Sequence, residues 1–284
     1  MLEILFDTLD KKKWINKIVD TYNNINEDIA LVFSRDILVS KLLPLHLVTL
    51  ACLIDAFTKQ QKRVYLSKNN EHIFQYLIND LKFGLYFSLG RDYAEPEISD
   101  NVFNLWRIKN EEKELYPKEI EKYFKKVYFK NKDLSPISEA LVEAYYNVFD
   151  HSNSDGNAFS LLKYDTETNK LYASISDFGK GIAKSVREND PSIQNDLLAI
   201  EYAIQDNYTI KSQSHNRGFG LGNILNCTNI ARILCNSVTL INRNKRIRIL
   251  ETGFEYPGTL IDFEINLDGL EDEEYIDFFT FNDF

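Results

Sequence analysis

Glu143 and Asn147 are a first pair of residues whose types and spacing suit chemistry. Four positions apart, they share one face of a helix, and Asp150 continues that face one turn later. Beside a polyphosphate, an amide oxygen ligates Mg²⁺ and a carboxylate orients or deprotonates water. The alternative is an ordinary solvated helix face, so this pair alone does not decide the function.

A second group of polar and small residues follows a β-rich segment. Leu171 to Ser176 predicts a strand, and Asp177, Gly179 and Gly181 come directly after it. A carboxylate at a strand end accepts a hydrogen bond from an amine such as that of adenine, and glycines let a ring approach the backbone closely. Many ordinary turns have the same composition.

A third group is rich in glycine and precedes a predicted helix, Asn223 to Ile230. Backbone N–H groups in such a loop face an anion, and the positive end of the helix dipole adds to the attraction. The pattern predicts a phosphate-binding loop, although one G-x-G-x-G motif is weak by itself. The residues of this group are Asn216, Arg217, Gly218, Phe219, Gly220, Leu221 and Gly222.

The order and spacing of these groups match a known scheme. The run from Glu143 to Asp150 resembles the N box of the GHKL superfamily, which includes DNA gyrase, heat-shock chaperones, histidine kinases and mismatch-repair ATPases. The two glycine groups are similar to its first and second glycine boxes, and Gly258 with Thr259 is similar to its late Gly-Thr pair. The resemblance covers about Ser135 to Leu267.

The resemblance implies a Bergerat-type pocket that binds ATP and Mg²⁺. In it, Asn147 ligates Mg²⁺, Glu143 activates water or serves as its kinase counterpart, and Asp177 reads adenine with help from Thr259. The second glycine box cradles the phosphates beneath a lid of roughly residues 184 to 217. We expect Asn216 and Arg217 to add contacts because of their position and charge, and we include Asp150 in the nucleotide-binding set.

The predicted fold class is α/β, in two domains. Residues 1–110 are expected to form a smaller α/β domain, which resembles an anti-sigma-antagonist (STAS-like) domain; an unrelated α/β or helical domain is the alternative. A connecting helix is expected over 111–134. Residues 135–269 are expected to form a two-layer α/β sandwich with helices on one face of a mixed sheet. An acidic aromatic tail follows over 270–284.

Individual elements are predicted from periodicity and β-branched content. The predicted helices are Pro44–Gln61, Glu71–Leu81 and a helix opened by Ser135 and Pro136. The predicted strands are Arg63–Ser67, Val238–Asn242, Arg246–Leu250 and Leu260–Leu267, with further apolar runs at Ile29–Phe33 and Gly84–Leu89 in an alternation of strand and helix.

Composition narrows the function classes. The formal charge of -10 argues against general nucleic-acid binding, and the basic stretch Arg243–Arg248 is an exception that also suits a solvated strand face. No apolar run approaches the roughly 20 residues of a membrane span, and the first residues lack the features of a secretion signal. The three cysteines lack metal-site spacing and suit reduced, buried thiols. We therefore expect a cytoplasmic protein without a membrane partner.

The sequence excludes two other classes of nucleotide-binding protein, the eukaryotic-type protein kinases and the P-loop proteins. The tripeptide Asp177-Phe178-Gly179 also occurs in eukaryotic-type protein kinases, but their catalytic loop and early glycine loop are missing, and no P-loop is present. The leading hypothesis is a Mg²⁺-dependent regulatory ATPase whose nucleotide state controls a protein partner. The alternatives are an anti-sigma-type protein serine kinase and a non-catalytic nucleotide-sensing module. The resemblance leaves a homodimer open.

Overall fold

The protein has an α/β fold with two separate sheets, as the sequence predicts. The computed structural model describes residues 1–88, 101–152, 157–204 and 220–272. The first sheet has three strands in the order β1-β2-β3, and the second has five strands in the order β4-β5-β6-β8-β7.

The N-terminal unit is built from two consecutive βαβ units. Its parallel strands are β1 (Leu2–Phe6), β2 (Ile29–Phe33) and β3 (Val64–Leu66), joined by α1 (Lys11–Asn23) and α2 (Pro44–Lys59). The Asp10 side chain accepts from Lys13 N–H and so starts α1, while Pro44 fits the first turn of α2. The short helix Val39–Lys41 precedes α2.

Three helical pieces complete this unit: α3 (Glu71–Gln75), a π-helical turn over Tyr76–Asp80, and α4 (Phe83–Ser88). The predicted helix 44–61 and strand 63–67 are confirmed within two residues. The apolar run at 84–89 differs from the expected strand because it lies largely in α4, where Phe83 and Tyr86 are buried. A short apolar run does not by itself separate a strand from a helix.

The second unit is an antiparallel sheet with helices on one face. Its strands are β4 (Val102–Lys109), β5 (Asn157–Asp165), β6 (Lys170–Asp177), β7 (Ile230–Arg243) and β8 (Arg246–Asn266). Its helices are α5 (Leu115–Val127), α6 (Ser135–Ser152), α7 (Ile182–Asn189), α8 (Asp196–Ala203) and α9 (Gly220–Cys227), with short 3₁₀ turns over Asn110–Glu112 and Leu267–Gly269.

Two expectations about this unit are corrected by the strand pairing. Every pairing within the five-stranded sheet is antiparallel, so among the described residues the parallel pairs lie in the N-terminal sheet. β4 pairs with β5, which places the change from one unit to the other before Val102 instead of at 110. The segment expected as a connecting helix contains α5, whose Tyr116, Ile120 and Phe124 belong to the core of the second unit.

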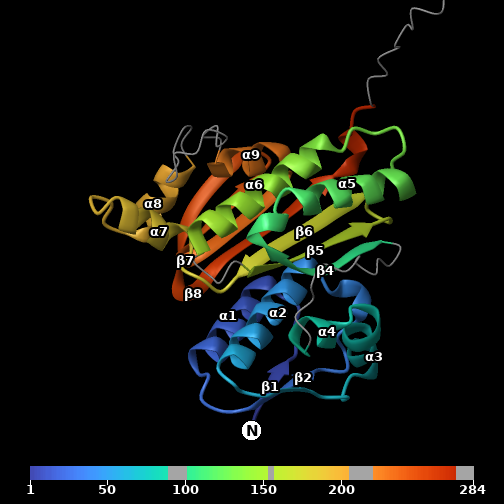
Figure 1. Cartoon of the computed structure of the whole chain (residues 1–284), viewed down its shortest axis with the longest axis vertical. Coiled ribbons are helices and arrows are strands. Elements are labelled where there is room, and N and C mark those ends of the chain that lie inside the picture. The colour runs from blue at the N-terminus through green and yellow to red at the C-terminus, as the bar shows by residue number, and fades with distance from the viewer. Residues whose placement is uncertain (89–100, 153–156, 205–219, 273–284) are drawn as a thin grey trace, which may run out of the picture.

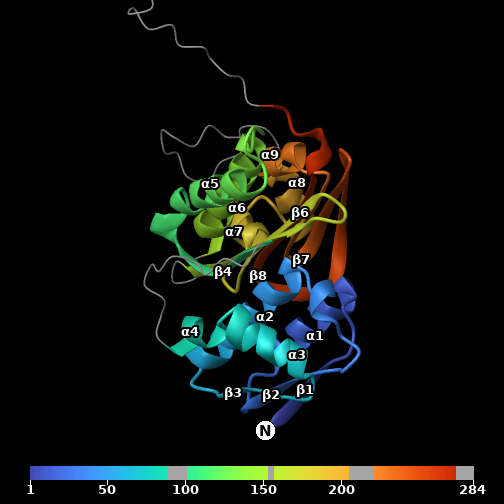
Figure 2. The same cartoon turned by 90° about the vertical axis from the view of Figure 1, so that its right-hand side faces the viewer.

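The elements stack in four layers (Figures 1 and 2). The small sheet lies at one end, α1 and α2 lie between the two sheets, and α5, α6 and α9 cover the far face of the large sheet (Figure 1). Each side of the large sheet has its own apolar core: Leu171, Ala173 and Ile175 face the helices of the second unit, while Phe159 and Leu161 pack with α2. Both faces of the central strands are therefore buried.

The strands β7 and β8 each fold back on themselves. Asn244 N–H donates to Asn229 O at 2.9 Å. The 14 residues of β7 would separate these ends by roughly 45 Å in a straight strand. The reversal lies at Asn236, which has a φ of 50° and register irregularities on both sides. In β8, Gly253 has a φ of 76° at the corresponding place.

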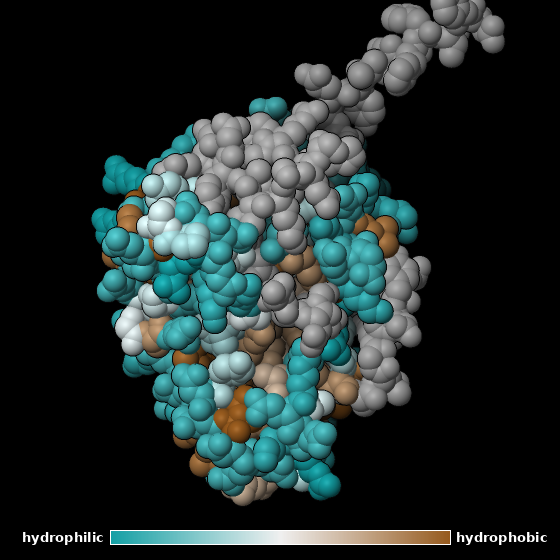
Figure 3. Space-filling view, turned by 60° about the vertical axis from the view of Figure 1, so that its left-hand side comes forward, coloured by the Kyte–Doolittle hydropathy of each residue, from teal (hydrophilic) through white to brown (hydrophobic). Residues whose placement is uncertain are grey.

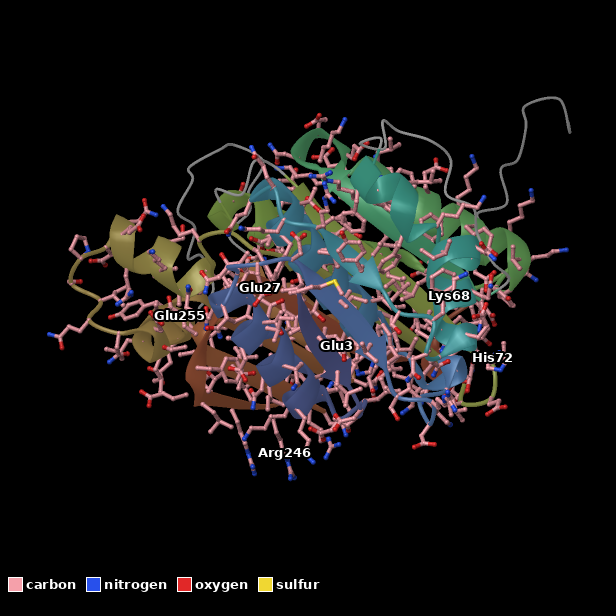
Figure 4. The ribbon with its side chains drawn as sticks, turned by 90° about the horizontal axis from the view of Figure 1, so that it is seen from below. Glu3, Glu27, Lys68, His72, Arg246 and Glu255 are labelled. Atoms are coloured by element: carbon pink, nitrogen blue, oxygen red, sulfur yellow. The ribbon has the colours of Figure 1, made fainter. Side chains whose placement is uncertain are left out.

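This reversal decides where the basic stretch lies. Asn229 also contacts Asn266, at the end of the sheet where β6 begins, so the turn at Asn244 lies at the end opposite Asp177. Figure 4 shows Arg246 projecting outward at the rim of the molecule. Residues 243–248 are all exposed, which agrees with the solvated strand ends considered from the sequence.

A buried carboxylate joins the two units. Asp262 on β8 is 2% exposed. Its Oδ2 lies 2.7 Å from Lys11 Nζ of α1 and 3.1 Å from Arg232 Nη1 of β7, and its Oδ1 accepts from Ser174 Oγ at 2.8 Å. A carboxylate with this burial requires such partners, because an unpaired charge there would be strongly destabilising.

The outer surface shows no dominant apolar region on the face drawn in Figure 3, where hydrophilic residues prevail and hydrophobic residues form small separate groups. Within the parts of the chain that the structure describes, every helix is too short or too polar to traverse a bilayer.

The interface carboxylate generates a stability prediction. We expect Asp262→Ala to lower the free energy of unfolding by about 3 to 5 kcal/mol, because Lys11 and Arg232 lose their common counter-charge and Ser174 loses its acceptor. Urea unfolding measures this change. Glu3→Ala is the control, since Glu3 is exposed on the outer face of the small sheet (Figure 4) and should change stability by less than about 0.5 kcal/mol. Equal effects of the two substitutions would contradict a buried charge cluster.

Candidate functional site

Asp177 and Thr259 form the first half of the candidate site. They are paired residues at the end of β6 and within β8. Side chains alternate along a strand, so Asp177 continues the row of Leu171, Ala173 and Ile175, which face the helical layer. Thr259 continues the row of Ile261 in the same way. The sequence therefore places a carboxyl and a hydroxyl side by side beneath the helices.

Both side chains carry a polar atom without a partner. Thr259 N–H donates to Asp177 Oδ2 at 3.2 Å. Asp177 Oδ1 and Thr259 Oγ1 are buried and find no hydrogen-bond partner among the described residues. Burial raises the pKa of Asp177 to about 8, against the opposing effect of the Thr259 and Gly179 backbone N–H groups. Buried polar atoms of this kind are rare and call for an explanation such as a ligand.

Two glycines allow neighbouring backbone segments to approach the turn after Asp177 closely. A Cβ on Gly258, whose φ is 112°, would lie 2.3 Å from Asp177 O and 2.6 Å from Gly179 N. A Cβ on Gly181, whose φ is 84°, would lie 2.6 Å from Asn236 Oδ1. Only glycine satisfies both the left-handed conformation and the close approach at these positions. The backbone geometry of this turn therefore requires a glycine at position 181 of the predicted motif.

Glu143 and Asn147 form the second half of the site, on α6. Asn147 Nδ2 donates to Glu143 Oε1 at 2.9 Å and to Glu143 O at 2.8 Å. Asn147 is buried, and its amide oxygen accepts no hydrogen bond within the described part of the chain. Burial raises the pKa of Glu143 to about 7; Asn147 opposes this rise and the nearby Asp150 adds to it. A carboxyl that titrates near neutrality is suited to proton transfer.

The start of α6 differs in detail from the sequence expectation. The helix begins at Ser135, as predicted. Ser135 does not cap it, however, because its N–H and hydroxyl donate to the Asp133 carboxylate at 2.9 and 3.0 Å. These bonds lower the pKa of Asp133. Leu134 O instead accepts from Ile137 N–H and Ser138 N–H, so the first turn forms one residue earlier.

The glycine-rich loop is described only at its end. Asn216, Arg217, Gly218 and Phe219 lie outside the described residues. Helix α9 begins at Gly220, three residues before the predicted start, so Gly220, Leu221 and Gly222 belong to its first turn. Leu221 is buried in the core, and α9 packs against α6, which carries Glu143 and Asn147.

The first part of the expected lid belongs to the core instead. Helices α7 and α8 occupy most of residues 184–204, and Val186, Ala199 and Ile200 are buried there. Ser237 N–H and Oγ both donate to Asp196 Oδ2, which ties α8 to β7. Residues 205–217 of the expected lid lie outside the described residues.

The two halves of the site are adjacent but separate. Helix α6 contacts β6, β8, α7 and α9, so it lies over the strands that carry Asp177 and Thr259. Among the described residues, no hydrogen bond or ion pair links Asp177 or Thr259 to Glu143 or Asn147. The sequence-predicted residues thus form two polar centres on facing layers.

A cavity on the side of the sheet that the N-terminal unit covers has Asp177 among its lining residues. It has a volume of about 150 Å³, and its walls also include Tyr22, Cys52, Phe159 and Phe178. Ligand pockets usually measure about 300 to 1,000 Å³, so this cavity is too small for a nucleotide.

Sequence reasoning missed one residue of the site, Asn236. Its Nδ2 donates to Lys180 O at 2.9 Å, and its Oδ1 accepts from Lys184 N–H at 3.0 Å. A signal was present, because Asn adopts a positive φ more readily than other non-glycine residues and Asn236-Ser237 separates two apolar runs. Such a turn signal identifies a corner but not its neighbour across the fold.

No family model matches this chain, and no curated protein or solved structure does either.

The buried acid predicts a pH dependence of stability. The pKa of Asp177 is 3.8 as a free group and about 8 in the fold, so between these values the folded state holds a proton that the unfolded state has lost. The free energy of unfolding should therefore fall as pH rises from about 4 to about 8, by up to about 1.4 kcal/mol per pH unit from this group. Asp177→Asn should remove that part of the slope.

Urea unfolding of wild type and Asp177→Asn across this pH range checks the prediction. The difference between the two curves isolates Asp177, because Glu143 titrates in both proteins with the same sign. Parallel curves would mean that the Asp177 pKa is close to its ordinary value.

Proposed function

We propose that the protein binds ATP beside α6 at the place where β6 ends, with adenine at Asp177 and Thr259. The supporting observation is the pair of buried atoms without partners, Asp177 Oδ1 and Thr259 Oγ1. Adenine presents an amine next to a ring nitrogen that accepts hydrogen bonds. A carboxylate accepts from the amine and a hydroxyl donates to the nitrogen, so the two groups match this edge.

The charge state of Asp177 sets a condition on binding. Its Oδ2 already accepts from Thr259 N–H, so a proton on the carboxyl resides on Oδ1, the atom proposed to accept from the amine. Since the pKa of Asp177 is about 8, ATP binding near neutral pH releases this proton. Once this proton has left, guanine would present a carbonyl where adenine has the amine, and two acceptors would face each other. The ionised form of the site thus favours adenine.

The phosphates are proposed to lie toward α6 and the first turn of α9. The amide nitrogen of Asn147 is engaged by Glu143, which leaves the amide oxygen for a cation. No cluster of three or more His, Cys, Asp or Glu side chains in the described residues suits a metal. This donor set fits Mg²⁺, which is usually held by one or two protein oxygens together with substrate phosphates. When bound, Mg²⁺ would neutralise phosphate charge.

Glu143 is proposed to act as the general base for a water molecule. Its pKa of about 7 lets the carboxylate accept a proton at neutral pH, and the hydrogen bond from Asn147 fixes its orientation. The chain is thus proposed to be an ATPase of the GHKL type, in which hydrolysis resets the nucleotide state and this state controls a protein partner. The motif resemblance and the two polar centres support this proposal.

A cytoplasmic location is part of the same proposal. All three cysteines are free, and Cys52 and Cys235 are buried. Burial raises the pKa of both thiols, so they are inert core residues. Reduced thiols of this kind suit the cytoplasm.

Calorimetric titration with ATP and Mg²⁺ tests nucleotide binding. Wild type should bind ATP with release of a proton near pH 7 and should bind more tightly as pH rises through 8. Asp177→Asn should weaken binding by about 100-fold, because its amide must turn a donor toward either Thr259 N–H or the adenine amine. Thr259→Val should weaken it by about tenfold.

Thr58→Val, an exposed position on α2, is the matched control and should leave the affinity unchanged. The absence of ATP binding by wild type at millimolar concentration would refute the proposed function. Equal affinities of wild type and Asp177→Asn would refute the placement of adenine.

Steady-state release of phosphate tests the proposed role of Glu143. Glu143→Gln should lower kcat by about 10² to 10⁴-fold while ATP affinity stays within about threefold, because the amide retains the shape but does not take a proton. Glu139→Gln is the control, since Glu139 is an exposed acid one turn earlier on the same helix. Unchanged turnover in Glu143→Gln would remove the general-base role.

A further inference from the structure

Asn236 combines two structural tasks at one position. Its φ of 50° forms the corner at which β7 reverses, and its buried side chain reaches the turn that follows Asp177. Helix α7 starts after Gly181, which has no side chain to cap it. Asn236 Oδ1 accepts from Lys184 N–H and so provides the missing cap from another strand, while its Nδ2 donates to Lys180 O.

The same side chain limits the position of Gly181. A Cβ on Gly181 would lie 2.6 Å from Asn236 Oδ1 and 2.8 Å from Gly258 O, so the glycine backbone is enclosed from two sides. Gly258 in turn abuts the backbone of Asp177 and Gly179. The turn from Asp177 to Gly181 is thus held by β8 at its first residues and by Asn236 at its last.

We infer that Asn236 is a positioning residue that fixes the Asp177 turn for adenine and thereby sets the preference for adenine over guanine. This inference rests on the proposed ATP site. Asn236 acts through Lys180 O and Lys184 N–H, not by contact with the nucleotide. Without these two bonds, the end of the turn and the start of α7 lose their anchor, and we expect Asp177 Oδ1 to move off the line to the adenine amine. Neither bond goes to α6 or α9, so we expect the phosphate end to change less.

The test compares ATP and GTP affinities in the full chain by calorimetry with Mg²⁺. Asn236→Gly keeps a residue that tolerates the positive φ and removes both side-chain bonds. We expect its Kd for ATP to rise about tenfold, its Kd for GTP to change less than twofold, and the ATP preference to fall about tenfold. Asn244→Gly is the matched control, because Asn244 also has a positive φ, of 48°, but is exposed at the opposite end of the sheet.

Three outcomes would overturn the inference: wild-type selectivity in Asn236→Gly, an equal loss of ATP and GTP affinity, or the same change in Asn244→Gly. Should Asn236→Gly fail to fold, Asn236→Asp carries the test, because its carboxylate keeps the acceptor for Lys184 N–H but repels Lys180 O. The same fall in the ATP preference is expected. Failure of wild type to bind ATP would instead refute the proposed function, which separates the two claims.

Discussion

The candidate site depends on how closely β8 approaches the end of β6. Gly258 lies so near the backbone of Asp177 that a Cβ there would collide with Asp177 O. This approach pairs Asp177 with Thr259 and brings Thr259 N–H to the carboxyl. It also shields the carboxyl from water, which is why the pKa of Asp177 is raised. A looser contact would hydrate the acid and remove the orphaned acceptor on which adenine recognition is proposed to depend.

The sequence predicted features that local spacing determines. The shared helix face of Glu143 and Asn147, the strand that ends at Asp177 and the turn glycines follow from periods of 3.6 and 2 and from backbone freedom. Strand pairing and core packing between residues far apart in the sequence could not be predicted. Residues 102–109 were expected in the N-terminal domain because the pairing of β4 with β5 has no local signal, and residues 184–204 were expected in a lid although α7 and α8 contribute to the core.

The N-terminal unit contacts the rear of the proposed adenine site directly. Cys52 Sγ of α2 lies 3.3 Å from Ser176 O, the residue before Asp177. Phe178, the residue after it, makes edge contacts with Tyr22 of α1 and with Tyr256 of β8. Ser176 Oγ and Tyr256 OH share a buried hydrogen bond of 2.7 Å. The resemblance that covers 135–267 therefore leaves out residues that support the Asp177 turn from behind.

The pairing of β6 with β8 has a consequence for the order of folding. The β5 and β6 strands are joined by a turn of four residues, and β7 meets β8 at Asn244 and Lys245, so both hairpins form from near neighbours. The bond from Thr259 to Asp177 spans 82 residues and closes a much longer loop. Loop closure costs more entropy as the loop lengthens, which makes such contacts late and rate-limiting. We therefore expect the proposed nucleotide site to be assembled late in folding, after its separate parts have taken shape.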